Sequence, residues 1–192
     1  MTALQWRSAL SADEQDAVRE LLAAAEAADG VAPVGEQVLR QLAGHGTGHL
    51  LFTDPGGALA GYLNLNSAGT AELAVRPDAR RRGIGTALVA AAIVRGGALT
   101  RFWAHGTLPA ARAFAASCRL RPARELIQMS RPLAAVPDPS VPPDISVRTY
   151  GGAADHAELL RVNNAAFSWH PEQGGWTEGD IARRVSEPWF DP

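Results

Sequence analysis

The stretch RPDARRRGIGTALVAAA, residues 76–92, most constrains how this chain can fold. The run TAELAV before it, Thr70–Val75, predicts a strand, and the apolar residues after Gly83 predict a helix beginning near Ile84. A strand that enters a helix through a tight loop leaves the first helical N–H groups without internal partners. With the helix dipole and three consecutive arginines, these groups predict a site for a phosphate or pyrophosphate.

Other interpretations of this loop remain open. Gly-x-Gly alone is a weak signal, so the arginines could form an exposed run before an ordinary helix. A nucleic-acid surface is disfavoured, because no aromatic residues accompany the arginines and the formal net charge is −2. The loop also lacks the Gly-Lys-Ser/Thr of a P-loop and the complete G-x-G-x-x-G of a dinucleotide-binding fold.

Composition indicates a globular protein, since 46% of its 192 residues are hydrophobic and 20% are charged. The single cysteine, Cys118, excludes an internal disulfide framework and a cysteine-based zinc site. The five histidines show no metal-ligand spacing, so we expect no metal. Because the first residues lack a signal-peptide pattern and no apolar run spans a bilayer, we expect a cytoplasmic protein with no membrane partner.

Strand and helix patterns alternate along the first two thirds of the chain, which predicts an α/β fold. We expect a mixed, largely antiparallel sheet with helices on both faces. In order, the expected elements are a strand at Leu4–Arg7, a helix capped by Ser11 and Glu14 and ended by Gly30, a helix within 35–44, a hairpin around Pro55, the strand Thr70–Val75, a helix from Ile84 to about Arg95, a strand at Thr100–His105, a helix at Pro109–Ser117 and a strand at Arg124–Leu133.

A proline-rich stretch, residues 134–144, separates this region from an apparent second copy of its opening. ISVRTY, residues 145–150, predicts a first strand, two helix patterns come after it, and HPEQGG at 170–175 echoes PVGEQV at 33–38. The echo includes no hairpin and no anion-binding motif. We therefore expect a complete domain over 1–133, a linker over 134–144, and the truncated start of a second domain over 145–192.

The loop resembles a known motif. The pattern Val-x-Pro-x-x-Arg-x-x-Gly-x-Gly is matched by Val75, Pro77, Arg80, Gly83 and Gly85. It resembles the acetyl-CoA signature of the GCN5-related N-acetyltransferase family, which implies that fold and acetyl-CoA as donor. In that family the strand backbone pairs with the pantetheine amides, and the loop amides hold the pyrophosphate. Carried over, these contacts fall on Leu73, Ala74, Val75, Arg81, Arg82, Gly83, Ile84, Gly85 and Thr86.

A closer resemblance covers nearly the whole chain. DGVAPVGEQVLRQL, GYLNL, RRRGIGTA, FWAHGTL, RELIQM and HPEQGGW are together similar to the mycothiol synthase family of actinobacteria. That family has two tandem acetyltransferase domains, which would explain the repeat. It acetylates the cysteine amine of cysteinyl-glucosaminyl-inositol. The resemblance implies this small molecule as acceptor, Glu36 and Glu172 as its contacts, and a monomer when full length. The alternative for each glutamate is an exposed residue favoured by a helix start.

The catalytic residues are not identified by the sequence. In the resembling family a tyrosine in the helix after the fifth strand protonates the leaving thiolate, but alignment places Ala115 there. Glu72 could act as a general base or be a solvated strand residue, and His105 and His170 could bind ligand or be structural. Two interpretations result: an enzyme of mycothiol synthesis, or a catalytically silent acetyl-CoA-binding half or truncated product that lacks the active domain. A third is an acetyltransferase of this fold that acts on another amine.

Overall fold

The computed structural model describes residues 3–134, 136, 137, 140, 142–170, 175–187 and 189–191. The chain divides into two compact units, Met1–Ile127 and Gln128–Pro192. Among the described residues, no helix is both long enough and apolar enough to cross a bilayer.

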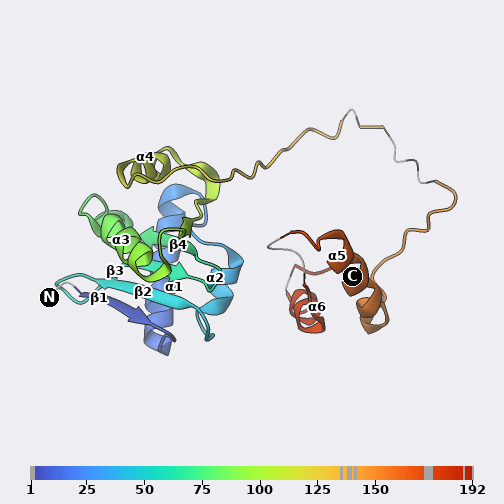
Figure 1. Ribbon diagram of the computed structural model, residues 1–192. Coiled ribbons are helices and arrows are strands. Elements are labelled where there is room, and N and C mark those ends of the chain that lie inside the picture. Colours follow the sequence, from blue (N-terminus) through green and yellow to red (C-terminus); the bar gives the residue numbers. More distant parts are fainter. Residues whose placement is uncertain are drawn as a thin grey trace. The chain divides into compact units, whose positions relative to one another are not determined.

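The first unit is built on a five-stranded sheet in the order β1-β2-β3-β4-β5 (Figure 1). The strands are β1 (Ala3–Arg7), β2 (Gly48–Thr53), β3 (Leu59–Leu65), β4 (Thr70–Val75) and β5 (Arg101–Phe102). The first four pair in an antiparallel manner, and β5 runs parallel to β4. The predicted mixed, largely antiparallel sheet is thus confirmed.

Helices cover both faces of this sheet. They are α1 (Ala12–Asp29), α2 (Glu36–Gln41), α3 (Ile84–Gly96) and α4 (Pro109–Ser117), with short 3₁₀ turns at Pro77–Ala79 and His105–Thr107. The predicted capping box is present, because the Ser11 side chain accepts from the Glu14 N–H while the Glu14 carboxylate accepts from the Ser11 N–H. Gly30 ends α1 in the left-handed conformation.

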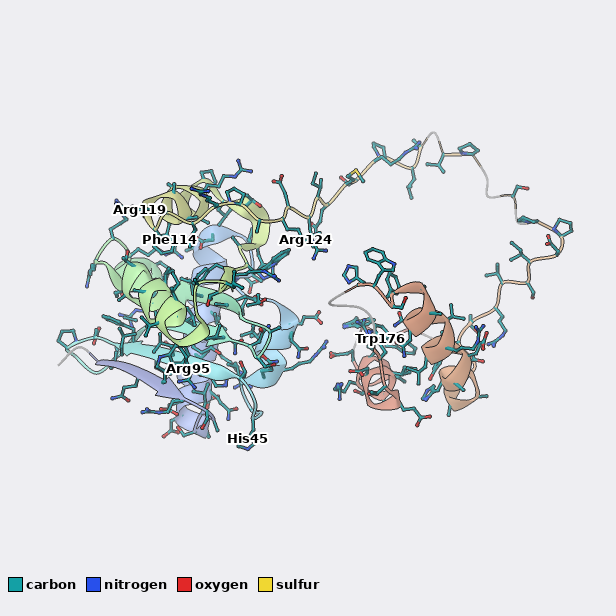
Figure 2. The ribbon with its side chains drawn as sticks, in the orientation of Figure 1. His45, Arg95, Phe114, Arg119, Arg124 and Trp176 are labelled. Atoms are coloured by element: carbon teal, nitrogen blue, oxygen red, sulfur yellow. The ribbon has the colours of Figure 1, made fainter. Side chains whose placement is uncertain are left out.

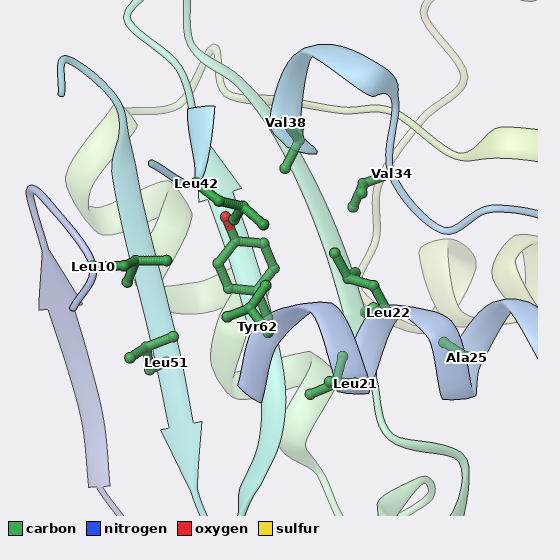
Figure 3. Close-up of a cluster of buried hydrophobic side chains, with 11 residues drawn as sticks. Leu10, Leu21, Leu22, Ala25, Val34, Val38, Leu42, Leu51 and Tyr62 are labelled. Carbon is green, nitrogen blue, oxygen red and sulfur yellow. The ribbon is translucent and has the colours of Figure 1, made fainter. Parts of the chain in front are cut away.

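One core lies between the sheet and the pair α1 and α2. Figure 3 shows the ring of Tyr62 among leucine side chains from these elements. The cluster comprises Leu10, Val18, Leu21, Leu22, Ala25, Val34, Val38, Leu42, Leu51, Tyr62 and Ala74. His49 Nδ1 lies 2.8 Å from the Tyr62 hydroxyl, and both side chains are fully buried. Burial lowers the pKa of His49 and raises the pKa of Tyr62.

The second core lies between α3 and the opposite face of the sheet. Its buried members are Leu50, Ala60, Leu63, Leu65, Ala71, Ala79, Ile84, Leu88 and Ala92. Gly61 on β3 permits the close approach, since a Cβ there would lie 2.7 Å from Ile84 Cγ2 and 3.1 Å from Leu88 Cδ1. Because Ile84 is the first residue of α3, this contact also fixes the loop that leads into the helix.

Three strand predictions are corrected. The strand expected over Thr100–His105 is only Arg101–Phe102. The segments Arg124–Leu133 and 145–150 form no strand, although both have the composition of one. A strand needs a hydrogen-bonded neighbour, and neither segment pairs with any described part of the chain.

The second unit contains a 3₁₀ turn (Gly152–Asp155), α5 (His156–Ala166) and α6 (Glu178–Val185). The two helices are joined by Asn164, whose amide donates to the Trp176 carbonyl at 2.9 Å and accepts from its N–H at 2.8 Å. Ile181 is the only buried apolar residue among those described in this unit. The second unit therefore has helices in the predicted order but, within its described residues, almost no core.

Candidate functional site

The loop between β4 and α3 is held in an unusual backbone conformation. Arg81 has a φ of 64° and Gly83 a φ of 80°, both in the left-handed region. Gly83 is also the N-cap of α3 and provides no side-chain cap. Residues of this conformation turn successive N–H groups toward a common side, as in anion-binding nests.

The amides of this loop are available to a ligand. Within the described chain, the N–H groups from Arg81 to Thr86 have no hydrogen-bond partner, and the first helical bond is that from the Ala87 N–H to the Gly83 carbonyl, at 3.0 Å. Unpaired N–H groups at a helix start carry partial positive charge and favour an anion. The structure thus brings the predicted loop residues into one uncapped helix start.

The neighbouring charges are arranged so that the loop remains positive. Arg81 and Arg82 are exposed, and Arg82 Nη2 donates to the Asp78 carbonyl at 2.9 Å. The Asp78 carboxylate would repel an anion, but it accepts from Arg76 Nε at 2.7 Å. This hydrogen bond lowers the pKa of Asp78, which stays charged and paired with Arg76.

Arg80, the arginine of the recognised motif, points to α1 rather than to the loop amides. Its two terminal nitrogens donate to the two carboxylate oxygens of Asp29 at 2.7 and 2.8 Å. Its Nε donates to the Val75 carbonyl at 3.2 Å. Paired bonds of this kind fix orientation as well as distance. Arg80 therefore ties the end of β4 to the last residue of α1, a role that the motif alone did not reveal.

The backbone of β4 is paired on one side and partly open on the other. The Arg76 N–H donates to the Ala60 carbonyl on β3, and the Trp103 N–H, just after β5, donates to the Ala71 carbonyl. Hydrogen-bonding sides alternate along a strand, so even-numbered residues of β4 face β3 and odd-numbered residues face β5. Because β5 pairs with β4 only at Thr70 and Ala71, the remaining odd-numbered residues face an opening.

That opening exposes part of the predicted strand contact. Within the described chain, the N–H and carbonyl of Leu73 and the N–H of Val75 have no backbone partner, while the Val75 carbonyl accepts from Arg80. The backbone of Ala74 faces β3 by the same alternation. Leu73 and Val75 are therefore the two strand residues with free groups for an extended amide-containing ligand.

Helix α4 covers the start of α3. A Cβ on Gly85 would lie 3.0 Å from Phe114 Cζ, so a side chain there would displace this ring. Phe114 is labelled on α4 in Figure 2. Ala115, the next residue, is half-buried and has no proton to donate. The position expected for a catalytic acid is thus occupied by a methyl group.

The predicted acceptor contacts have different outcomes. Glu36 is the first residue of α2 and its side chain is 68% exposed, with Oε2 2.7 Å from Arg40 Nη2. Glu172 lies outside the described residues. The carboxylate of Glu72 accepts from the N–H of Gly35, the residue before Glu36, at 2.7 Å and lies 2.9 Å from His105 Nε2. Glu72 is therefore not a solvated strand residue: its side chain is 15% exposed.

The described residues include no group of three or more histidine, cysteine, aspartate or glutamate side chains placed to hold a metal ion. Cys118, at the end of α4, is half-buried. The groups that the site offers are main-chain donors and two carboxylates, that of Glu36 at the start of α2 and that of Glu72, which binds the Gly35 N–H.

Comparisons with known proteins agree with this geometry. Residues 6–118 match the model of the Acetyltransferase (GNAT) family. The whole chain is 58% identical to a mycothiol acetyltransferase of Mycobacterium marinum, and 98% of it is 59% identical to a mycothiol acetyltransferase of Mycobacterium leprae. It spans only 62% and 64% of the length of these two relatives. A GCN5-related N-acetyltransferase structure from Sphaerobacter thermophilus, 24% identical, aligns with a TM-score of 0.56 over 84% of this chain and 58% of its own.

Proposed function

The chain belongs to the acetyltransferase (GNAT) family, and from this premise we propose that it acts as a mycothiol synthase. The proposed reaction transfers the acetyl group of acetyl-CoA to the cysteine amine of cysteinyl-glucosaminyl-inositol. The observation that carries this proposal is the uncapped start of α3, with its unpaired amides beside the open backbone of β4. Identity to mycothiol acetyltransferases over the whole chain supports the choice of acceptor.

Acetyl-CoA, the donor in this family, fits the groups that the site leaves open. We assign its pyrophosphate to the N–H groups from Arg81 to Thr86, with the Arg81 and Arg82 side chains adding positive charge. The free groups of Leu73 and Val75 would pair with the pantetheine amides. Ala74 would contribute through its position in the strand, since its own backbone groups face β3. When bound, acetyl-CoA supplies the activated thioester.

The acceptor carries an ammonium group and sugar hydroxyls, both of which donate hydrogen bonds to carboxylates. Glu36 suits this role because it is exposed at the start of α2, and Arg40 Nη2 already contacts one of its oxygens. We propose that Glu36 and Glu172 contact the acceptor. We also expect a monomer in the cytoplasm, where reducing conditions would preserve the acceptor's thiol.

A second candidate function rests on Ala115. A methyl group at this position of α4 cannot protonate a leaving thiolate. In this interpretation the first unit is a catalytically silent half that binds acetyl-CoA, and turnover belongs to a second domain.

Two measurements on the purified chain separate these candidates. Calorimetry measures acetyl-CoA binding, and mass spectrometry detects acetylated product from acetyl-CoA and cysteinyl-glucosaminyl-inositol. Product above the no-protein control supports synthesis by this chain. Binding without product supports the silent half, and Ala115→Tyr then tests the missing acid, with Ala116→Tyr on the same helix as control. Absence of acetyl-CoA binding would refute both candidates.

A further inference from the structure

We propose that Glu72 is a positioning residue, whose carboxylate fixes the start of α2 and so holds Glu36 where it meets the acceptor. This inference rests on the proposed function, because it concerns the acceptor contact of that same site. It assigns Glu72 a hydrogen-bonding role and no role in proton transfer. Glu72 can fill this role because its carboxylate holds the backbone of Gly35, the residue directly before Glu36.

Both contacts of Glu72 fall on a single oxygen. Oε2 accepts from the Gly35 N–H at 2.7 Å and lies 2.9 Å from His105 Nε2. A carboxylate oxygen only accepts hydrogen bonds, so the His105 Nε2–H is the donor of this bond. The Glu72 side chain is 15% exposed and that of His105 is 27% exposed, which limits competition from water.

These two bonds join three segments that are far apart in sequence. Glu72 is on β4, Gly35 lies 37 positions before it, and His105 lies 33 positions after it in the turn between β5 and α4. The Trp103 ring packs edge-on against the His105 ring, with 6.2 Å between centroids. The His105 ring thus holds the Glu72 oxygen that binds Gly35, and a Cβ on Gly35 would lie 3.6 Å from His105 Cε1.

Gly35 determines where Glu36 begins. It is the N-cap of α2, and Glu36 is the first helical residue. A glycine cap has no side chain to fix it, and the backbone of glycine is the most flexible of any residue. Among the described residues, Glu72 is the one acceptor for the Gly35 N–H. Without this bond, the start of α2 would lose its hydrogen bond to β4, and the core contacts of Val38 and Leu42 would be left to hold the helix.

Because both contacts of Glu72 are made by one oxygen, substitutions of this residue can distinguish a positioning role from a role in proton transfer. In Glu72→Gln the amide oxygen can occupy the place of Oε2 and accept from both donors, but the amide cannot take up a proton. In Glu72→Met the side chain is similar in size and accepts neither bond. A positioning role is therefore preserved by Gln and lost in Met, whereas a general base is lost in both.

The test compares Glu72→Gln and Glu72→Met with a matched control. Glu14 is also a half-buried glutamate that accepts from a backbone N–H, that of Ser11, and from a second side chain, Arg7. Because Glu14 holds the start of α1 instead of α2, Glu14→Met reports general destabilisation. Calorimetry measures the affinity of each variant for acetyl-CoA, and then its affinity for cysteinyl-glucosaminyl-inositol in saturating CoA, which has no acetyl group to transfer.

We expect Glu72→Met to weaken acceptor binding about tenfold, as for one lost hydrogen bond to a charged group. Glu72→Gln should stay within about twofold of the wild type, a factor smaller than one net hydrogen bond. All variants, Glu14→Met included, should keep their acetyl-CoA affinity. Equal loss in Glu72→Gln and Glu72→Met, or unchanged acceptor binding in Glu72→Met, would overturn the positioning role.

A second readout does not depend on the acceptor. Amide hydrogen exchange at Gly35 should accelerate in Glu72→Met but not in Glu72→Gln or Glu14→Met. If the wild type binds no acceptor, the proposed function fails, and exchange at Gly35 still decides whether Glu72 holds α2. If Glu72→Met does not fold, Gly35→Pro removes the donor instead, at a position whose φ of −75° suits proline. Unchanged exchange in the first turn of α2 in that variant would contradict the proposal.

Discussion

Gly61→Ala tests how closely the anion-binding loop depends on the packing of α3. The added Cβ would lie 2.7 Å from Ile84 Cγ2 and 3.1 Å from Leu88 Cδ1. Carbon atoms normally pack about 3.5 to 4 Å apart, so the start of α3 must move by roughly 1 Å. Overpacking of this kind lowers the free energy of unfolding by about 1–3 kcal/mol. Replacing a strand glycine by alanine raises it by about 0.5–1 kcal/mol, because glycine loses more backbone entropy on folding. With mid-range values of about 2 kcal/mol for the cost and about 0.75 kcal/mol for the gain, we expect the free energy of unfolding to fall by about 1 kcal/mol.

Scanning calorimetry measures this loss as a decrease in Tm of about 5 °C. Gly44→Ala is the control, because its Cβ would make only an ordinary contact, 3.6 Å from the Gln41 carbonyl oxygen. Because Ile84 opens α3, acetyl-CoA affinity should also fall by at least about threefold. Ile84→Ala removes the clashing methyl, so Gly61→Ala should cost less in that background. Equal Tm values for Gly61→Ala and Gly44→Ala would refute the packing argument.

Three further predictions concern the loop and the core. Gly83→Pro should abolish acetyl-CoA binding in calorimetry, because proline cannot adopt the φ of 80° found here. Retained affinity in this variant would refute the assignment of the pyrophosphate to this loop. Asp29→Asn should cost about 1 kcal/mol of stability and weaken acetyl-CoA binding, since Arg80 loses a charged, two-bond partner. Burial lowers the pKa of His49 from 6.5 in the folded state, so the unfolded chain binds a proton at this residue more readily. In urea titrations, the stabilising contribution of neutral His49 should be complete above pH 6.5 and should be lost as the pH falls below it. His49→Gln should flatten this dependence.

Local sequence patterns were sufficient for the elements that organise the site. Gly30 after an apolar helical period predicted the end of α1, and Val75 followed by a Gly-rich loop predicted the passage from β4 into α3. Both depend on interactions within a few residues, so they can be predicted without knowledge of the tertiary fold. The irregular structure of segment Arg124–Leu133 could not be predicted in this way, because a strand forms only if another strand lies beside it.

The contacts of the site depended on tertiary distances that the sequence does not contain. Glu72 gave no local sign that its carboxylate would meet Gly35 and His105, since those residues are separated from it by 37 and 33 positions. The run TAELAV predicted the strand that carries Glu72 and no contact of its side chain. A possible signal was the isolated polar residue between the apolar neighbours Ala71 and Leu73.

The pairing of Arg80 with Asp29 adds a residue of α1 to the acetyl-CoA motif, whose other members lie at the end of β4 and in the loop after it. Its arginine is joined to a carboxylate 51 positions earlier, at the end of a different helix. In homologues, substitutions at these two positions should therefore occur together. A chain that keeps the arginine but loses the aspartate should bind acetyl-CoA less tightly. A motif search that scores both positions should separate functional copies from decayed ones better than the loop pattern alone.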